Sequence, residues 1–153
     1  MMDSKAMAAD LGKPDISFSG FQLWIHGREI GDPREHWEDA NWLNVTAHCG
    51  APGADVWAQG PILQLADLVW WLKQLEDISR TMSGKAELVP VEPNLYIKLE
   101  MDKLGHVAMQ VNITPEHMSQ RHEFREQIDQ SYLPGLIRQI KTVLQKYPIQ
   151  GKR

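Results

Sequence analysis

The sequence has little cysteine, no surplus of positive charge and no long hydrophobic segment, and each absence excludes a class of protein. Cys49 is the only cysteine, so no internal disulfide can form and a reducing cytoplasm is expected. The net charge of −4 argues against a general nucleic-acid binder, because no basic excess neutralises phosphates. No apolar run reaches membrane-spanning length, and residues 1–14 lack the hydrophobic stretch of a secretion signal. We therefore expect a cytoplasmic protein that binds neither nucleic acid directly nor a membrane.

Motifs that assemble catalytic groups are also missing. The sequence has no glycine-rich phosphate loop, no nucleophile elbow and no His-x-x-x-His pair. His117 and His122 are spaced so that they would lie on opposite sides of a strand and align poorly on a helix. We expect no metal ion, no cofactor and no enzymatic activity. The alternative is an enzymatic or small-molecule-binding domain that uses His26, His48 and nearby carboxylates.

Length and composition indicate one domain. A chain of 153 residues with 42% apolar content can bury a hydrophobic core without disulfides or metals. We expect residues 15–148 to form a single α+β domain, with a flexible N-terminal tail at 1–14 and a C-terminal tail at 149–153. Pro90 and Pro93 mark a boundary between two halves of this domain, but the segment is too short to be a domain linker.

Apolar residues recur with two different periods. Alternation typical of strands buried on one face covers four segments: 21–26, 42–49, 94–101 and 106–113. Shorter signals at 56–59 and at Phe124 and Ile128 add two more strands. Helical spacing covers 65–75 and 133–144, the second helix opening at Asp129 or Ser131. The sequence thus predicts an antiparallel sheet of about six strands with two helices packed on one face.

The order of these elements is similar in the two halves. Residues 41–79 and 94–147 both read as strand, turn, strand and closing helix, with an insertion at 117–128 in the second copy. An internal β-β-α repeat is therefore expected, although few residues are identical between the copies.

Tryptophan occurs where the solvent face of the sheet should be. If Leu43 and Val45 face the helices, alternation turns Trp42 to the other side, and the same reasoning applies to Trp24 and Trp57. Indole rings among amides and histidines are the composition of a recognition surface, because they add contact area at low entropic cost. The alternatives are cross-strand packing, cover by a loop, or a seam between two copies of the chain.

A cluster of acidic residues follows the first of these strands. The segment contains Glu29, Asp32, Glu35, Glu38 and Asp39 against Arg28 and Arg34. Charged loops are commonly only solvated, but carboxylates beside Trp37 and Trp42 would also attract a cationic partner. We predict partner-binding residues at Trp24, Trp42, Trp57, Glu35, Trp37, Glu38 and Asp39.

Three further residues are expected to be structural. Trp70 and Trp71 lie within the first helix next to its apolar stripe, which favours core packing for them. Cys49 lies on the inward side of its strand and is interpreted as a small buried hydrophobic residue.

Short motifs carry a family resemblance. They are Gly27-Arg28-Glu29, then Trp37-Glu38-Asp39-Ala40-Asn41-Trp42-Leu43-Asn44-Val45, then Asp129-Gln130-Ser131-Tyr132-Leu133 before a closing helix. With the order of elements over most of residues 15–147, these motifs resemble the WapI-type immunity proteins. The connections at Ala51-Pro52-Gly53 and at 114–120 are longer than the family pattern.

The resemblance implies a small cytoplasmic bacterial protein that neutralises the toxic C-terminal domain of a contact-delivered polymorphic toxin. Such a protein needs a complementary surface and no catalysis. An acidic loop beside an aromatic face would suit a basic toxin domain, because charge sets the encounter rate and the rings slow dissociation. Beside the enzymatic or ligand-binding domain, a second alternative to an immunity protein is a self-associating structural domain. In that case the tryptophan face would be the interface of a homodimer.

Overall fold

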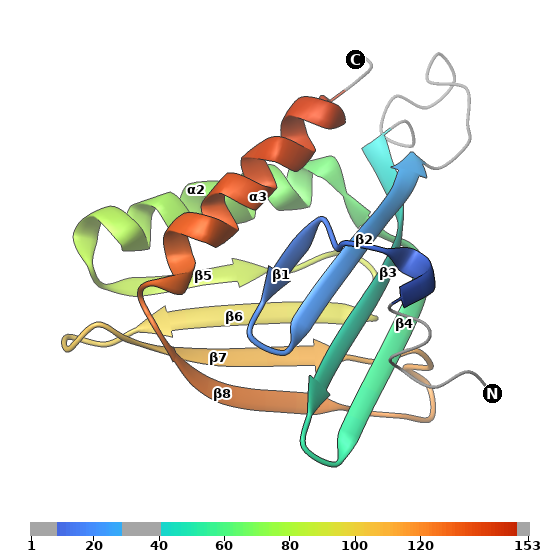
Figure 1. Ribbon diagram of the computed structural model, residues 1–153, viewed down its shortest axis with the longest axis horizontal. Helices are drawn as coiled ribbons and strands as arrows, with labels where there is room; N and C mark the ends of the chain where they lie inside the picture. Colours follow the sequence, from blue (N-terminus) through green and yellow to red (C-terminus); the bar gives the residue numbers. More distant parts are fainter. Residues whose placement is uncertain (1–8, 29–40, 150–153) are drawn as a thin grey trace.

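The chain folds into two antiparallel sheets and two long helices over the part that the computed structural model describes, residues 9–28 and 41–149 (Figure 1). The first sheet contains β1 (Ile16–Phe18), β2 (Phe21–Arg28), β3 (Trp42–Ala51) and β4 (Ala54–Gln64). The second contains β5 (Gly84–Leu88), β6 (Leu95–Met101), β7 (His106–Ile113) and β8 (Glu123–Asp129). Helix α2 (Leu65–Thr81) follows the first sheet and α3 (Tyr132–Lys146) the second. In both sheets the spatial order equals the chain order, so each is a simple meander.

The α+β class is confirmed, but the prediction of one sheet of about six strands is wrong, because there are two sheets of four strands each. After β4 the chain enters α2, and β5 then pairs only with β6. Alternation within a strand records which side is buried and carries no information about the neighbouring strand. Each half consists of four strands and a helix, so the repeated order of elements is longer than the expected β-β-α unit.

The helices start and stop where local chemistry directs them. The Asp67 carboxylate accepts a hydrogen bond from the Gln64 amide at 2.8 Å and so caps the first turn of α2. That helix ends at Met82, whose φ of 58° is left-handed. Before α3, Asp129 Oδ1 accepts from the Ser131 amide at 2.6 Å. Of the two predicted openings, Asp129 or Ser131, the N-cap residue of α3 is Ser131, whose own side chain makes no capping hydrogen bond.

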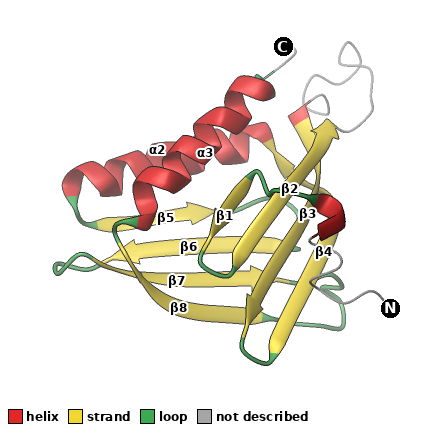
Figure 2. Ribbon diagram, in the orientation of Figure 1, coloured by secondary structure: helices red, strands yellow, loops and turns green. Residues whose placement is uncertain are grey.

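Each helix packs against the first strand of the sheet formed by the other half of the chain. Helix α2 lies against β5 and α3, whereas α3 lies against β1, and the two helices run side by side on one side of the molecule (Figure 2). A hydrogen bond from the Ser17 amide to Gln139 Oε1, at 2.7 Å, joins β1 to α3. Another, from Ser19 Oγ to Glu126 Oε2, joins the β1–β2 turn to β8. The two halves are therefore tied together at several points.

One hydrophobic core fills the space between the sheets and helices. Its largest side chains include Phe21 from β2, Leu43 from β3 and Trp71 from α2, all of them fully buried. The prediction of core packing is thus confirmed for Trp71 and wrong for Trp70, which is 61% exposed. Cys49 is buried on the inner side of β3, as expected, and burial raises the pKa of its thiol to about 12.

Candidate functional site

The outer face of the first sheet carries the tryptophans that alternation assigned to it. Strand register places Trp24 opposite Thr46, and Thr46 opposite Gln59. In the next row, His48 lies opposite Trp57. Neighbouring positions along these strands, such as Leu23, Val45 and Ala58, belong to the core instead. Trp42 lies at the far end of this face opposite Gln64 and is half-buried.

Trp24 lies on this outer face but is not available at the surface. Only 3% of the residue is exposed, and its indole N–H donates to the Gly12 carbonyl at 2.9 Å. The segment leading into β1 is itself anchored, because Asp15 donates its amide to Leu23 and accepts the Ile25 amide on its carboxylate at 2.7 Å. The side was therefore predicted correctly, whereas the expectation of a contact residue at Trp24 has to be corrected: the chain before β1 crosses the ring.

Trp57 is the half-exposed member of an aromatic row. Its ring stacks on Trp24 with centroids 5.6 Å apart and on His48 at 4.3 Å. His48 is in turn held by Asp55 Oδ1 at 2.7 Å from Nε2 and by Gln22 Oε1 at 2.9 Å from Nδ1. A ring fixed on both sides loses little conformational freedom when a partner binds, which suits it to be a rigid anchor.

Two glycines make room for this arrangement. A side-chain carbon at Gly50 would lie 2.6 Å from Asp55 Oδ1 and 3.2 Å from a carbon of the His48 ring. One at Gly20 would lie 2.2 Å from the Gly50 carbonyl oxygen, closer than atoms tolerate. The Gly50 amide donates to the Gly20 carbonyl at 3.0 Å, so the β1–β2 turn packs directly on β3 behind the His48–Asp55 pair.

The two histidines of the acid–base alternative have separate partners. His26 is exposed, and its Nε2 lies 2.7 Å from Thr46 Oγ1, whereas His48 pairs with Asp55. Asp55 was not singled out from the sequence. The β3–β4 hairpin register would have found it, because it lies two residues before Trp57 and hence on the same face.

The acidic half of the predicted surface falls outside the described residues. Glu35, Trp37, Glu38 and Asp39 all belong to that part of the chain. The strand that leads into this segment ends at Arg28, whose guanidinium donates to the Pro148 carbonyl beyond α3. The position of the loop relative to Trp42 and Trp57 stays a prediction.

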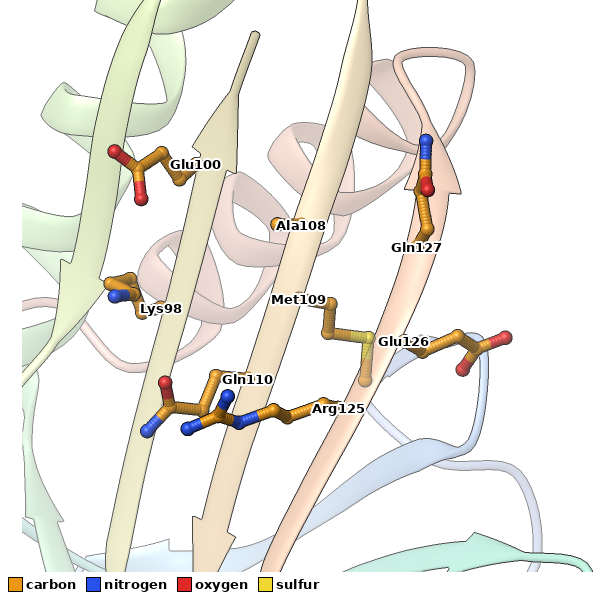
Figure 3. Close-up of a pocket in the computed structure, with 8 residues that line it drawn as sticks. All are labelled: Lys98, Glu100, Ala108, Met109, Gln110, Arg125, Glu126 and Gln127. Atoms are coloured by element: carbon orange, nitrogen blue, oxygen red, sulfur yellow. The ribbon is translucent and has the colours of Figure 1, made fainter.

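A second concave surface lies on the outer face of the second sheet, where sequence reasoning predicted none. It is a hollow of about 470 Å³ across β6, β7 and β8 (Figure 3). Ala108 lies between Glu100 and Gln127 in the strand register, and its small side chain leaves the hollow open. Charges here are partly paired within the sheet, as in the 2.7 Å contact of Arg125 Nε with Glu123. The surface lacks an aromatic ring at its centre, which is why composition gave no signal for it.

Within residues 9–28 and 41–149, no group of three or more histidine, cysteine, aspartate or glutamate side chains is arranged to hold a metal ion. In the same ranges, no helix combines the length and hydropathy needed to cross a bilayer.

Comparison with known proteins gives a family match that covers most of the chain. The model of a family described as "Immunity protein WapI-like family" matches residues 13–148. No curated protein and no solved structure matches the sequence.

Proposed function

Because this chain belongs to the WapI-like immunity protein family, we propose that it neutralises a cognate toxin domain by binding it directly. The match over residues 13–148 is the observation that carries this proposal, since it includes both sheets and both helices. Binding without catalysis requires a complementary surface, and we propose that the outer face of the first sheet is this surface. On this proposal the protein acts in the cytoplasm, the compartment expected for a chain with a single cysteine.

The proposed contact surface is centred on Trp57. It includes Trp42 and the acidic segment with Glu35, Trp37, Glu38 and Asp39, while Trp24 supports the Trp57 ring from beneath. A half-exposed tryptophan that is already stacked has the properties of an interface hot spot, because its rotamer is fixed before binding. The carboxylates and the net charge of −4 favour a basic toxin domain, whose association would slow as salt screens the attraction.

The test compares two identical substitutions on the two sheets. Gln59 and Gln127 are both exposed, both point outward, and they lie on the edge strands β4 and β8. Gln59→Arg adds a bulky positive group to the proposed surface and should weaken binding of a basic toxin domain at least about tenfold. Gln127→Arg should leave the affinity within about twofold.

The partner for this experiment is the purified C-terminal domain encoded by the adjacent large reading frame, assayed by pull-down and calorimetry at low and high salt. Thermal melts confirm that both variants fold. Absence of binding by the unmodified protein at either salt concentration contradicts the proposed function. If only Gln127→Arg loses binding, the toxin contacts the outer face of the second sheet and not that of the first.

The paired His48 and Asp55 side chains favour a second candidate, a domain with acid–base chemistry. If protection depended on such chemistry, His48→Gln would abolish protection of cells while toxin binding stayed intact. Equal protection by this variant and the unmodified protein would eliminate the candidate. Self-association through the tryptophan face is tested separately by light scattering. A molecular mass equal to that of a monomer would exclude the homodimer.

A further inference from the structure

Trp70 is the most exposed of the tryptophans that the structure describes. It is 61% exposed on α2, although the next residue, Trp71, is fully buried in the core. Val89, just beyond β5, is 62% exposed as well. Tryptophan and arginine are enriched among the residues that dominate the energetics of protein interfaces, which makes the exposed Trp70 ring a candidate contact residue.

The exposed ring forms one wall of a groove between α2 and β5, which lie side by side (Figure 1). The groove has a volume of about 440 Å³, with Ala66 and Trp70 on the helix side and Glu87 and Val89 on the strand side. Gln74 bridges the walls, because its Nε2 donates to the Glu87 carbonyl at 3.1 Å and its Oε1 accepts the Glu87 amide at 3.0 Å. These two hydrogen bonds join α2 to β5 and fix the spacing of the two walls.

Two acidic residues, Asp67 and Glu87, line the same groove. The Tyr96 hydroxyl donates to Glu87 Oε2 at 2.6 Å, and Lys85 Nζ pairs with Glu87 Oε1 at 3.3 Å. Both contacts lower the pKa of Glu87, which stays ionised at neutral pH. Asp67 lies one turn before Trp70, and burial raises its pKa because water solvates the carboxylate poorly. A cation entering the groove would relieve that cost at Asp67. The ring attracts positive charge as well, since Lys73 Nζ already lies 5.2 Å from the Trp70 centroid.

From this geometry we propose that the groove between α2 and β5 binds an arginine side chain of a protein partner. The flat guanidinium would stack on Trp70 and donate to Asp67 and Glu87, replacing the contacts that Lys73 and Lys85 make there, while its methylene stem packs on Ala66 and Val89. A lysine ammonium offers neither the planar stacking surface nor the forked donors. The site is built from other elements than the Trp57 surface and does not depend on the proposed function.

The experiment follows the indole N–H signal of Trp70 by ¹⁵N NMR while N-acetyl-arginine-N-methylamide is added. The signal is assigned by its loss in Trp70→Phe. We expect a saturable shift with this probe, and a dissociation constant at least about fivefold higher for the norleucine and lysine analogues. Absence of a saturable shift, or equal dissociation constants for the three probes, overturns the proposal.

A pair of double variants distinguishes the effect of the two groove carboxylates on arginine binding from the effect of the protein's net charge. Asp67→Asn/Glu87→Gln keeps hydrogen-bond acceptors at both positions and should raise the arginine dissociation constant about fivefold. The matched control Glu100→Gln/Glu123→Gln removes the same charge from the outer face of the second sheet and should leave it within about twofold. Equal effects of the two pairs contradict a site in the groove. No toxin domain is present in these titrations, so a failure to bind arginine leaves the proposed function unaffected. A failure to bind the toxin domain likewise leaves the arginine site unaffected.

Discussion

Replacing Trp24 by alanine should destabilise the protein far more than replacing Trp70, although alternation and helix position alone would suggest the reverse. Trp24 lies on the outer face of a sheet, but its ring is 3% exposed, stacks on Trp57 and donates to Gly12. Truncating a buried tryptophan to alanine costs about 3–5 kcal/mol. The lost hydrogen bond adds little beyond that range, because the exposed Gly12 carbonyl can turn to water. We expect a loss of about 4 kcal/mol in the free energy of unfolding.

Trp70 gives the matched comparison. Its alanine variant loses the contact with Lys73, worth about 0.5 kcal/mol at an exposed site, and gains a similar amount from the helix propensity of alanine. The net change should lie within about 0.5 kcal/mol. Trp24→Phe keeps an aromatic ring against Trp57 and loses the hydrogen bond to Gly12, so it should fall between the two.

The assay is equilibrium unfolding in urea, followed by far-UV circular dichroism so that the removed fluorophore does not affect the signal. Equal slopes for all variants would show that free energies can be compared. A loss below about 1 kcal/mol for Trp24→Ala, or a loss no larger than that of Trp70→Ala, would mean that the chain before β1 does not seal the ring.

Three further predictions concern single residues. Gly20→Ala places a carbon 2.2 Å from the Gly50 carbonyl and should cost at least about 2 kcal/mol in thermal melts; an unchanged midpoint would contradict this close approach. Gly135→Ala in α3 meets only an arginine nitrogen at 3.8 Å and should raise stability by about 0.5–1 kcal/mol, measured in the same melts. The pKa of Cys49 is raised from 9.0 to about 12, so its contribution is fully present below pH 9 and is lost as pH rises towards 12. Urea midpoints of Cys49→Ala should therefore fall less over this window than those of the unmodified protein, and parallel curves would argue against a buried thiol.

Side-chain alternation predicted which face of each strand points to the core. It did not predict the burial of Trp24, because a segment distant from the strand covers the outer face there. The pattern placed Trp24 opposite the core correctly, but no periodicity reports that Gly12 accepts its indole N–H. Helical spacing could have separated Trp71 from Trp70. Trp71 lies three residues after Leu68 and four before Leu75, both fully buried, whereas Trp70 is turned by about 100° from that line.

The number of sheets was also predicted wrongly, because two strands that end a sheet could not be recognised from the sequence. Strands β1 and β5 are only three and five residues long, too short for alternation to be recognised, yet each forms an edge of its sheet. Without them the remaining strands read as one sheet. The candidate site was predictable in part: hairpin register alone would bring Asp55 beside His48, whereas the groove at Trp70 depends on how α2 lies against β5.

The hydrogen bond between β1 and α3 has a consequence for synthesis on the ribosome. Ser17 and Gln139 are 122 positions apart, so the first strand emerges long before the helix that packs on it has been translated. Until then the nascent first half carries an uncovered apolar surface, which makes it a natural client for chaperones. Fragments cut between α2 and β5 should accordingly fail to acquire native structure separately and should recover it when mixed.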